Sequence, residues 1–192
     1  MVVIEFVILV TVAYFLGNIS PSILLGKAMG VDIKKEGSGN AGTTNALRVL
    51  GKKAAVITLI VDIGKGAFAV WLGMHFGNYT IGTVCALAVF CGHIWPCLYS
   101  FKGGKGVATA FGVILAVDWF LALVTLLIVG VGLAASHRMS VGSILGAVCF
   151  PIACRIIEPG FFWIGIAMAI IVVVKHRANI KRLIKGEEPK MF

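Results

Sequence analysis

Long apolar stretches separated by short polar segments dominate this chain. Because a helix needs about 20 mostly apolar residues to cross a hydrocarbon core of roughly 30 Å, each stretch is a candidate membrane span. The candidates are residues 2–26, 54–76, 79–100, 106–118, 119–136, 140–155 and 160–175. The pattern predicts an all-α polytopic membrane protein of about seven transmembrane helices. The fourth and sixth stretches are short, so five spans with two re-entrant segments is the alternative.

Composition excludes an ordinary soluble domain. Hydrophobic residues make up 59% of the chain and charged residues only 13%, whereas soluble domains carry roughly 25% charged residues. No soluble second domain stands out, so we expect residues 1–192 to form a single integral-membrane domain. The first apolar stretch has no basic leader and carries Glu5, which favours a retained span over a cleaved signal.

The basic residues predict the orientation of the chain. Its net charge of +9 would suggest nucleic acid in a soluble protein, but Lys and Arg also mark the cytoplasmic loops of membrane proteins. With the N-terminus outside and the C-terminus in the cytoplasm, fifteen of the seventeen basic residues fall in inner loops or the tail, and only Lys65 and Arg155 do not. We therefore expect no nucleic-acid partner.

The first inner segment, residues 37–48, reads GSGNAGTTNALR. Its glycines allow left-handed backbone conformations that turn successive N–H groups toward one point, and its hydroxyls and amides add neutral donors. A helix beginning near Thr43 would direct its positive end at the same point, with Arg48 one turn further on. The segment is either an anion-binding cradle or a flexible loop with a helix cap.

The second inner segment, residues 92–109, brings Lys105 together with three glycines at a helix start. It is not a nucleotide-binding Walker A loop, because Tyr99 stands where the first glycine belongs and Gly106 follows the lysine. His93 is either a polar residue satisfied by a neighbouring helix or a general base. The HxxxxD acyltransferase motif is absent, since Leu98 occupies the acidic position.

The third inner segment, residues 175–188, continues the last span as a basic amphipathic helix. Helical spacing places His176, Asn179 and Arg182 on one face. Binding to anionic lipid explains the charge of this segment equally well, but it does not explain the histidine and the asparagine.

Polar residues inside the spans predict three further features. Asp62 and Lys65 are one turn apart and should form an ion pair facing the bundle. A kink is expected in the first span, where polar residues adjoin Pro21. The five cysteines lie in apolar runs without metal-ligand spacing, so no metal site is predicted.

The three segments GSGNAGTTNALR, GHIWPCLYSFKGGKGVAT and HRANIKRLIKGEE resemble the signature motifs of the bacterial acyl-phosphate glycerol-3-phosphate acyltransferases, the PlsY family. The resemblance covers the whole chain in length, span layout and motif order. It implies a multi-pass enzyme of the bacterial inner membrane with its active site facing the cytoplasm. Such an enzyme moves a fatty acyl group from acyl phosphate to the 1-hydroxyl of sn-glycerol 3-phosphate. The products are lysophosphatidate and phosphate, in the first acylation of phospholipid synthesis.

The implied partners are acyl phosphate, sn-glycerol 3-phosphate, membrane lipid and the upstream enzyme that forms acyl phosphate. No cofactor is expected, and no nucleophile motif demands a covalent intermediate. The expected catalytic residues are His93, Asn45 and Lys105. Those expected to bind acyl phosphate are Ser38, Gly39, Asn40, Gly42, Thr43, Gly103 and Gly104. Those expected to bind glycerol 3-phosphate are Arg48, Lys105, Ser140, His176, Asn179 and Arg182.

Two other classes of function remain open from the sequence. A small transporter of a phosphorylated solute could use polar groups and helix N-termini within the membrane, but the polar motifs gather on one side only. A lipid-binding structural subunit would account for the basic charge but not for Asn40, Asn45, His93 and Asn179. One-sided chemistry therefore favours an enzyme.

Overall fold

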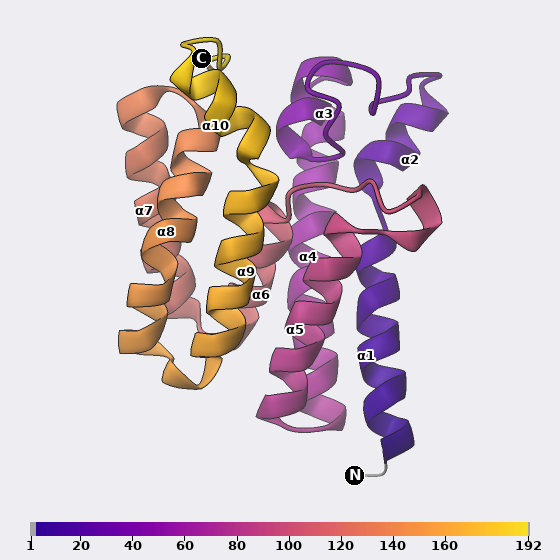
Figure 1. Cartoon of the computed structure of the whole chain (residues 1–192). Coiled ribbons are helices and arrows are strands. Elements are labelled where there is room, and N and C mark those ends of the chain that lie inside the picture. The colour runs from indigo at the N-terminus through magenta and orange to yellow at the C-terminus, as the bar shows by residue number, and fades with distance from the viewer. Residues whose placement is uncertain (1–2, 192) are drawn as a thin grey trace. The chain divides into compact units, whose positions relative to one another are not determined.

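A computed structural model describes residues 3–191, and all regular secondary structure in that range is helical. Residue 2, where the first predicted span begins, lies outside the described residues. The chain divides into two compact units, residues 1–117 (unit 1) and 118–192 (unit 2), and the single integral-membrane domain stays a prediction. Figure 1 labels the helices of both units.

In its described residues, 3–117, unit 1 contains six α-helices and a short 3₁₀ helix. They are α1 (Val3–Asn18), α2 (Pro21–Ala28), α3 (Thr43–Val49), α4 (Lys52–Phe76), α5 (Tyr79–Ile94), η1 (Cys97–Tyr99) and α6 (Val107–Val117). Glycines let the long helices approach closely, as is usual in membranes. A Cβ on Gly112 of α6 would overlap the Ile63 carbonyl of α4, and one on Gly92 of α5 would overlap the Tyr14 carbonyl of α1.

The predicted kink in the first span is confirmed as a break between α1 and α2, which are bent by 41°. Pro21 stands at the start of α2, where its missing N–H costs nothing. Beside the break, Asn18 is fully buried and its amide donates to the Tyr14 carbonyl at 2.8 Å. Its Oδ1 accepts a hydrogen bond from the Leu98 amide at 3.2 Å, so this residue joins the break to the segment after α5.

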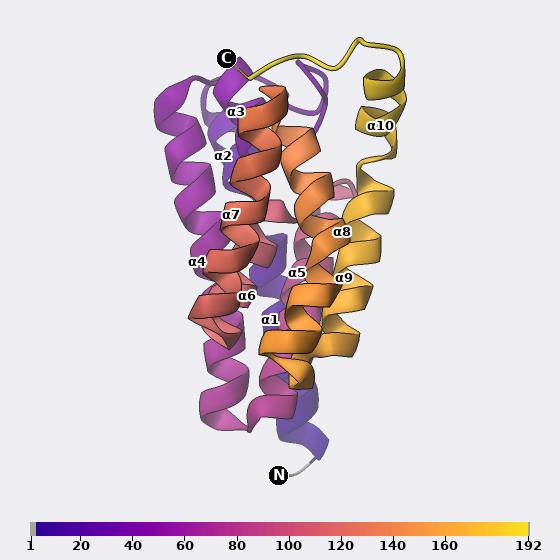
Figure 2. The ribbon, with the colours of Figure 1, turned by 90° about the vertical axis from the view of Figure 1, so that its left-hand side faces the viewer.

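Unit 2 contains α7 (Trp119–Ser136), α8 (Met139–Ile157), η2 (Pro159–Phe161), α9 (Phe162–Lys175) and α10 (Arg177–Ile184). The Asp118 side chain caps α7 by accepting from the Leu121 amide at 2.6 Å, which explains a charge between two apolar stretches. The helices α9 and α10 are bent by 52° relative to each other. The C-terminal segment after α10 is the yellow trace in Figure 2.

The described helices support fewer complete spans than the seven predicted. Four helical stretches, 52–76, 79–99, 119–136 and 139–157, are long and apolar enough to cross a membrane. The bent pairs α1–α2 and α9–α10 raise the number to six if each is one span. The sixth predicted stretch forms a helix of 19 residues, whereas the fourth forms the 11-residue α6, which is short for a complete crossing.

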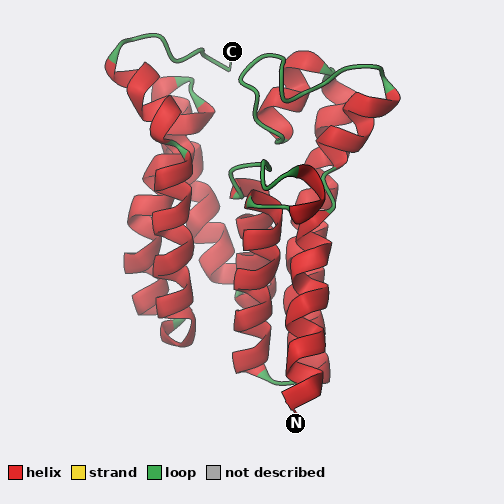
Figure 3. Ribbon diagram, turned by 45° about the vertical axis from the view of Figure 1, so that its right-hand side comes forward, coloured by secondary structure: helices red, strands yellow, loops and turns green. Residues whose placement is uncertain are grey.

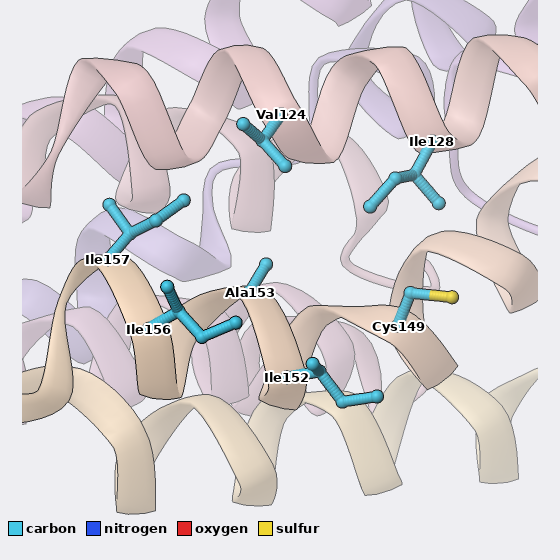
Figure 4. Close-up of a pocket in the computed structure, with 7 residues that line it drawn as sticks. All are labelled: Val124, Ile128, Cys149, Ile152, Ala153, Ile156 and Ile157. Atoms are coloured by element: carbon cyan, nitrogen blue, oxygen red, sulfur yellow. The ribbon is translucent and has the colours of Figure 1, made fainter.

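An apolar groove between α7 and α8 has a volume of about 370 Å³ (Figure 4). Its lining residues are Val124, Ile128, Cys149, Ile152, Ala153, Ile156 and Ile157. It offers no charged group to an anion, and Ile152 and Ile156 are exposed.

Candidate functional site

The loop between α2 and α3 carries the first predicted motif, and Asn45 gives it its shape. Asn45 Oδ1 accepts from the Ser38 amide at 2.8 Å, while its Nδ2 donates to the carbonyls of Ile33 and Glu36, both at 3.1 Å. The side chain is fully buried. The amide of Asn45 therefore supports the loop through three backbone groups, and its predicted catalytic role stays a prediction.

The residues predicted to cradle acyl phosphate line this loop. Ser38 and Gly39 are exposed, and Asn40, Gly42 and Thr43 are half-buried. Gly39 has a φ of +67°, a conformation that glycine adopts without strain. The Thr43 hydroxyl is buried and has no hydrogen-bond partner among residues 3–191. A buried hydroxyl without a partner is costly in a folded protein, and here it lies in a motif predicted to bind an anion.

The loop before α6 carries the second motif and lies at the same end of unit 1 as the first, where Figure 3 shows both in green. The Gly103 amide donates to the Ile94 carbonyl at 3.2 Å and the Gly104 amide to the His93 carbonyl at 3.1 Å. These two N–H groups therefore cap the end of α5, and the binding of acyl phosphate by Gly103 and Gly104 stays a prediction. Lys105, which follows them, is half-buried.

Gly104 brings the two loops together. A Cβ at this position would overlap His93 Nε2 and would come within 2.9 Å of the Ala41 carbonyl in the first loop. Only glycine therefore allows the second loop to lie between the histidine ring and the first loop. Gly104 therefore serves close packing here, in addition to the hydrogen bond from its N–H to the His93 carbonyl.

Three buried charged or titratable side chains, Asp62, Lys65 and His93, form a cluster next to the second loop, where His93 adjoins Gly104. The predicted ion pair is confirmed, with Lys65 Nζ 2.7 Å from Asp62 Oδ1. Lys65 Nζ also donates to the Ile19 carbonyl at 2.6 Å and the Gly17 carbonyl at 3.2 Å. It lies 2.9 Å from His93 Nδ1, which is 3.3 Å from Asp62 Oδ1. The sequence predicts the pair but not its contact with His93, which is 28 residues from Lys65.

Basic side chains gather around Tyr99 at this end of unit 1. Lys34 Nζ donates to the Tyr99 carbonyl at 3.0 Å and lies 5.3 Å from the centre of its ring. Burial, together with repulsion from Lys102 and Lys27, lowers the pKa of Lys34, although Asp32 opposes that shift. This surface therefore carries a concentrated positive charge.

Unit 2 carries a second polar cluster, in which Glu188 is the central residue. One carboxylate oxygen, Oε1, accepts from Asn179 Nδ2 at 2.6 Å and from the Ser140 hydroxyl at 2.7 Å. The other, Oε2, accepts from Arg182 Nε at 2.7 Å. Burial alone would raise the pKa of Glu188, but these three donors outweigh it and hold the pKa below its usual value.

The structure thus unites Ser140, Asn179 and Arg182 of the predicted acceptor site around a carboxylate that the sequence did not single out. The only signal for Glu188 in the sequence is a pair of glutamates, eight and nine residues beyond Asn179, in the same motif. His176, also predicted here, is buried, and its Nδ1 lies 2.8 Å from the Val172 carbonyl.

The remaining predicted phosphate ligands, Arg48 and Lys105, belong to unit 1. Arg48 is exposed at the end of α3. Among residues 3–191, no group of three or more His, Cys, Asp or Glu side chains is arranged to hold a metal ion.

Comparison with known proteins gives consistent matches over nearly the whole chain. The model of the glycerol-3-phosphate acyltransferase family matches residues 7–186. The chain is 41% identical to the glycerol-3-phosphate acyltransferase of Clostridioides difficile, covering 100% of this chain and 98% of the relative. It is 43% identical to that of Finegoldia magna, covering 96% of each.

Two solved structures have the same fold. Both are crystal structures of PlsY, described as an integral membrane glycerol 3-phosphate acyltransferase, in a glycerol 3-phosphate form and a lysophosphatidic acid form. The TM-scores are 0.92 and 0.88, at 33% identity, covering 96% of this chain and 94% of the other.

Proposed function

This chain belongs to the glycerol-3-phosphate acyltransferase family, and we propose that its acyl donor is acyl phosphate. The fatty acyl group passes to the 1-hydroxyl of sn-glycerol 3-phosphate at the cytoplasmic face of the bacterial inner membrane. The products are lysophosphatidate and inorganic phosphate, and the acyl phosphate comes from an upstream enzyme. The observation that carries this proposal is the meeting of the two glycine-rich loops at Gly104 and Ala41, with Lys105 beside them.

The transfer proceeds by direct attack, without a covalent enzyme intermediate. Acyl phosphate is a mixed anhydride with a good leaving group. The acceptor oxygen forms the new ester bond to the acyl carbon, the bond from that carbon to the phosphate oxygen breaks, and the hydroxyl proton ends on the phosphate product. Catalysis then rests on holding both substrates in line and on donors that stabilise the departing phosphate and the oxyanion.

Unit 1 supplies the residues for the acyl-phosphate head. The loop residues Ser38, Gly39, Asn40, Gly42 and Thr43 surround it, and the buried Thr43 hydroxyl gains a partner. Gly103 and Gly104 let the loop approach closely, and Lys105 supplies the positive charge. The acyl chain stays in the bilayer or between helices.

Within unit 2 we propose that Ser140, His176, Asn179 and Arg182 bind glycerol 3-phosphate, and the roles of Arg48 and Lys105 of unit 1 in binding it stay predictions from the sequence. Within the unit 2 cluster, Glu188 fixes the donors Ser140, Asn179 and Arg182 in place. Guanidinium and amide donors suit a phosphate monoester.

The first experiment measures phosphate release by the purified protein in detergent with palmitoyl phosphate, with and without glycerol 3-phosphate. A parallel sample receives palmitoyl-CoA. We expect release that requires both substrates, formation of lysophosphatidate, and no product from the CoA ester. Product from palmitoyl-CoA, with none from palmitoyl phosphate, would exclude acyl phosphate as the donor. Solute uptake into reconstituted vesicles without any acyl transfer would favour the transporter alternative.

Substitution of Asn179 or Arg182 by Ala tests the acceptor site. We expect the KM for glycerol 3-phosphate to rise by roughly tenfold or more, since a lost hydrogen bond to a charged group costs about 1.5–3 kcal/mol. The KM for palmitoyl phosphate should stay near the wild-type value. An unchanged KM for glycerol 3-phosphate in both variants would remove these residues from the acceptor site. The matched control is Lys181→Ala, on an exposed side chain of the same helix.

A further inference from the structure

The turn that follows α5 presents apolar side chains at the end of a membrane span. The stretch 79–99 is long and apolar enough to cross a membrane, and Trp95, Leu98 and Phe101 lie near or just beyond its end. All three are exposed, Leu98 by 66% and Phe101 by 60%. Aromatic and apolar side chains at this level of a span meet the boundary between hydrocarbon and lipid headgroups.

Hydrogen bonds fix the shape of this turn. The amides of Tyr99 and Phe101 both donate to the Pro96 carbonyl, at 3.0 and 2.9 Å. Ser100 and Phe101 have φ values of +57° and +58°, which residues other than glycine adopt only at a cost in free energy. The turn is therefore a built feature that presents its apolar side chains in a fixed direction.

Three lysines surround Tyr99 beside the turn. Lys34 Nζ lies 5.3 Å and Lys27 Nζ 5.7 Å from the centre of the ring, within the range of a cation–π contact. Burial, and then repulsion from Lys102 and Lys27, lower the pKa of Lys34, so the three ammonium groups are close enough to repel one another. Lys27 and Lys102 are exposed and Lys34 is half-buried. We call these three residues the basic triad.

The basic triad has no carboxylate of its own. None of its members forms an ion pair with another described residue of the chain. Asp32, which opposes the pKa shift of Lys34, lies 3.8 Å from Lys35 Nζ and accepts from the Lys34 backbone amide at 3.1 Å. Because like charges held close together repel, an anion that binds among the three lysines is stabilised.

We propose that the basic triad binds the phosphate of an anionic phospholipid, while Leu98 and Phe101 lie among its acyl chains. The charge of the triad selects the headgroup, and the apolar side chains at the end of the span select a lipid over a soluble phosphate. Lys102 directly precedes Gly103, so the bound lipid holds the start of the second loop at the membrane surface. The inference does not depend on the proposed function, because these residues are not assigned to either substrate.

Tryptophan fluorescence in lipid nanodiscs tests the site. The chain has four tryptophans, and a variant with Trp71, Trp119 and Trp163 replaced by Phe, all exposed side chains, leaves Trp95 as the reporter. Brominated phosphatidylglycerol and brominated phosphatidylcholine with the same acyl chains are titrated into a phosphatidylcholine bilayer. We expect phosphatidylglycerol to quench Trp95 at a mole fraction at least about tenfold lower. Equal quenching by the two lipids would overturn the proposal.

Two double variants in the same background locate the site. In Lys27→Ala/Lys102→Ala the preference for phosphatidylglycerol should fall by about tenfold or more, since each lysine near an anionic surface contributes about fivefold. The matched control is Lys52→Ala/Lys53→Ala, which removes two exposed lysines at the start of α4 and should keep the preference. Equal loss in both would show general attraction to the net charge and contradict a site.

Competition identifies the source of the phosphate. Inorganic phosphate should not restore the fluorescence of Trp95, and recovery would assign the triad to free phosphate instead of lipid. Palmitoyl phosphate should displace brominated phosphatidylglycerol no better than dipalmitoyl phosphatidate does. Stronger displacement would place the triad on the path of the substrate and overturn the lipid assignment.

Size-exclusion profiles and thermal unfolding confirm that each variant is folded. If Lys27→Ala/Lys102→Ala does not fold, the Trp95 reporter protein is titrated at low and high salt instead. Its preference for phosphatidylglycerol should weaken as salt screens the lysines. A preference that does not change with salt would contradict binding by the triad.

Discussion

Glu188 shows how one carboxylate can organise several polar residues. It is 6% exposed and accepts three side-chain hydrogen bonds. The Arg138 side chain donates to its backbone carbonyl at 2.9 Å, and the Met191 amide donates to the His137 carbonyl at 2.7 Å. Glu188 and Met191 therefore hold the C-terminal segment against the residues directly before α8.

The depressed pKa of Glu188 predicts a pH-dependent contribution to stability. Because its donors favour the charged form, this contribution is present above the usual value of 4.5 and is lost as pH falls through the lower folded pKa. At pH 7 we expect Glu188→Gln to lose about 1.5–3 kcal/mol of unfolding free energy. The difference in Tm between the two proteins should shrink as the pH falls below 4.5.

The neighbouring Glu187 is exposed, so Glu187→Gln is the matched control and should melt with the wild type at every pH. Thermal unfolding in detergent, followed by circular dichroism between pH 3 and pH 7, measures the effect. A difference in Tm between wild type and Glu188→Gln that stays constant over this range would contradict the assignment.

At the level of elements, close contact between glycines and backbone carbonyls holds unit 1 together. The helix α6 has only 11 residues, so its place depends on packing against α4 more than on its own length. Gly66 of α4 would overlap the Thr109 carbonyl if it carried a Cβ, and Gly112 of α6 would overlap the Ile63 carbonyl. Backbone carbonyls cannot move aside as the end of a flexible side chain can.

Gly112→Ala should therefore destabilise unit 1. We expect a cost of about 1–3 kcal/mol from overpacking, which lowers Tm by several degrees for a chain of this size. Differential scanning fluorimetry of the purified variant measures the change. Gly130→Ala on α7 is the control, because a Cβ there meets nothing within 4 Å. Equal Tm values for the two variants would show that the contact with Ile63 carries no strain.

At the scale of the whole molecule, cysteine labelling tests the orientation of the chain in the membrane and whether α6 crosses the membrane. In a full-length chain without its native cysteines, we expect Trp119→Cys, at the start of α7, to react with a membrane-impermeant maleimide in intact cells. Phe76→Cys, at the end of α4, should react as well, and Lys35→Cys only after permeabilisation. All three side chains are exposed. Labelling of Trp119→Cys only after permeabilisation would show that α6 does not cross.

Much of the architecture follows from the sequence, because apolar length, the kink at Pro21 and the Asp62–Lys65 pair depend on local spacing. The two glycine-rich loops of unit 1 could be located in the sequence for the same reason, because each motif is a run of consecutive residues. The sequence does not predict the contacts between residues that are distant in the chain. The bonds of Asn45 to its own loop, the capping of α5 by Gly103 and Gly104, and the convergence on Glu188 require tertiary structure that no periodicity reveals.

The bond from Lys65 to the break between α1 and α2 has a consequence for the order of membrane insertion. The Ile19 carbonyl finds its partner 46 residues later in the chain, so α1 and α2 emerge from the ribosome before the ammonium group that satisfies their break exists. A bare carbonyl is costly in hydrocarbon. We therefore expect the bent pair α1–α2 to wait at the lipid–water boundary, or beside the insertion machinery, until α4 has been synthesised.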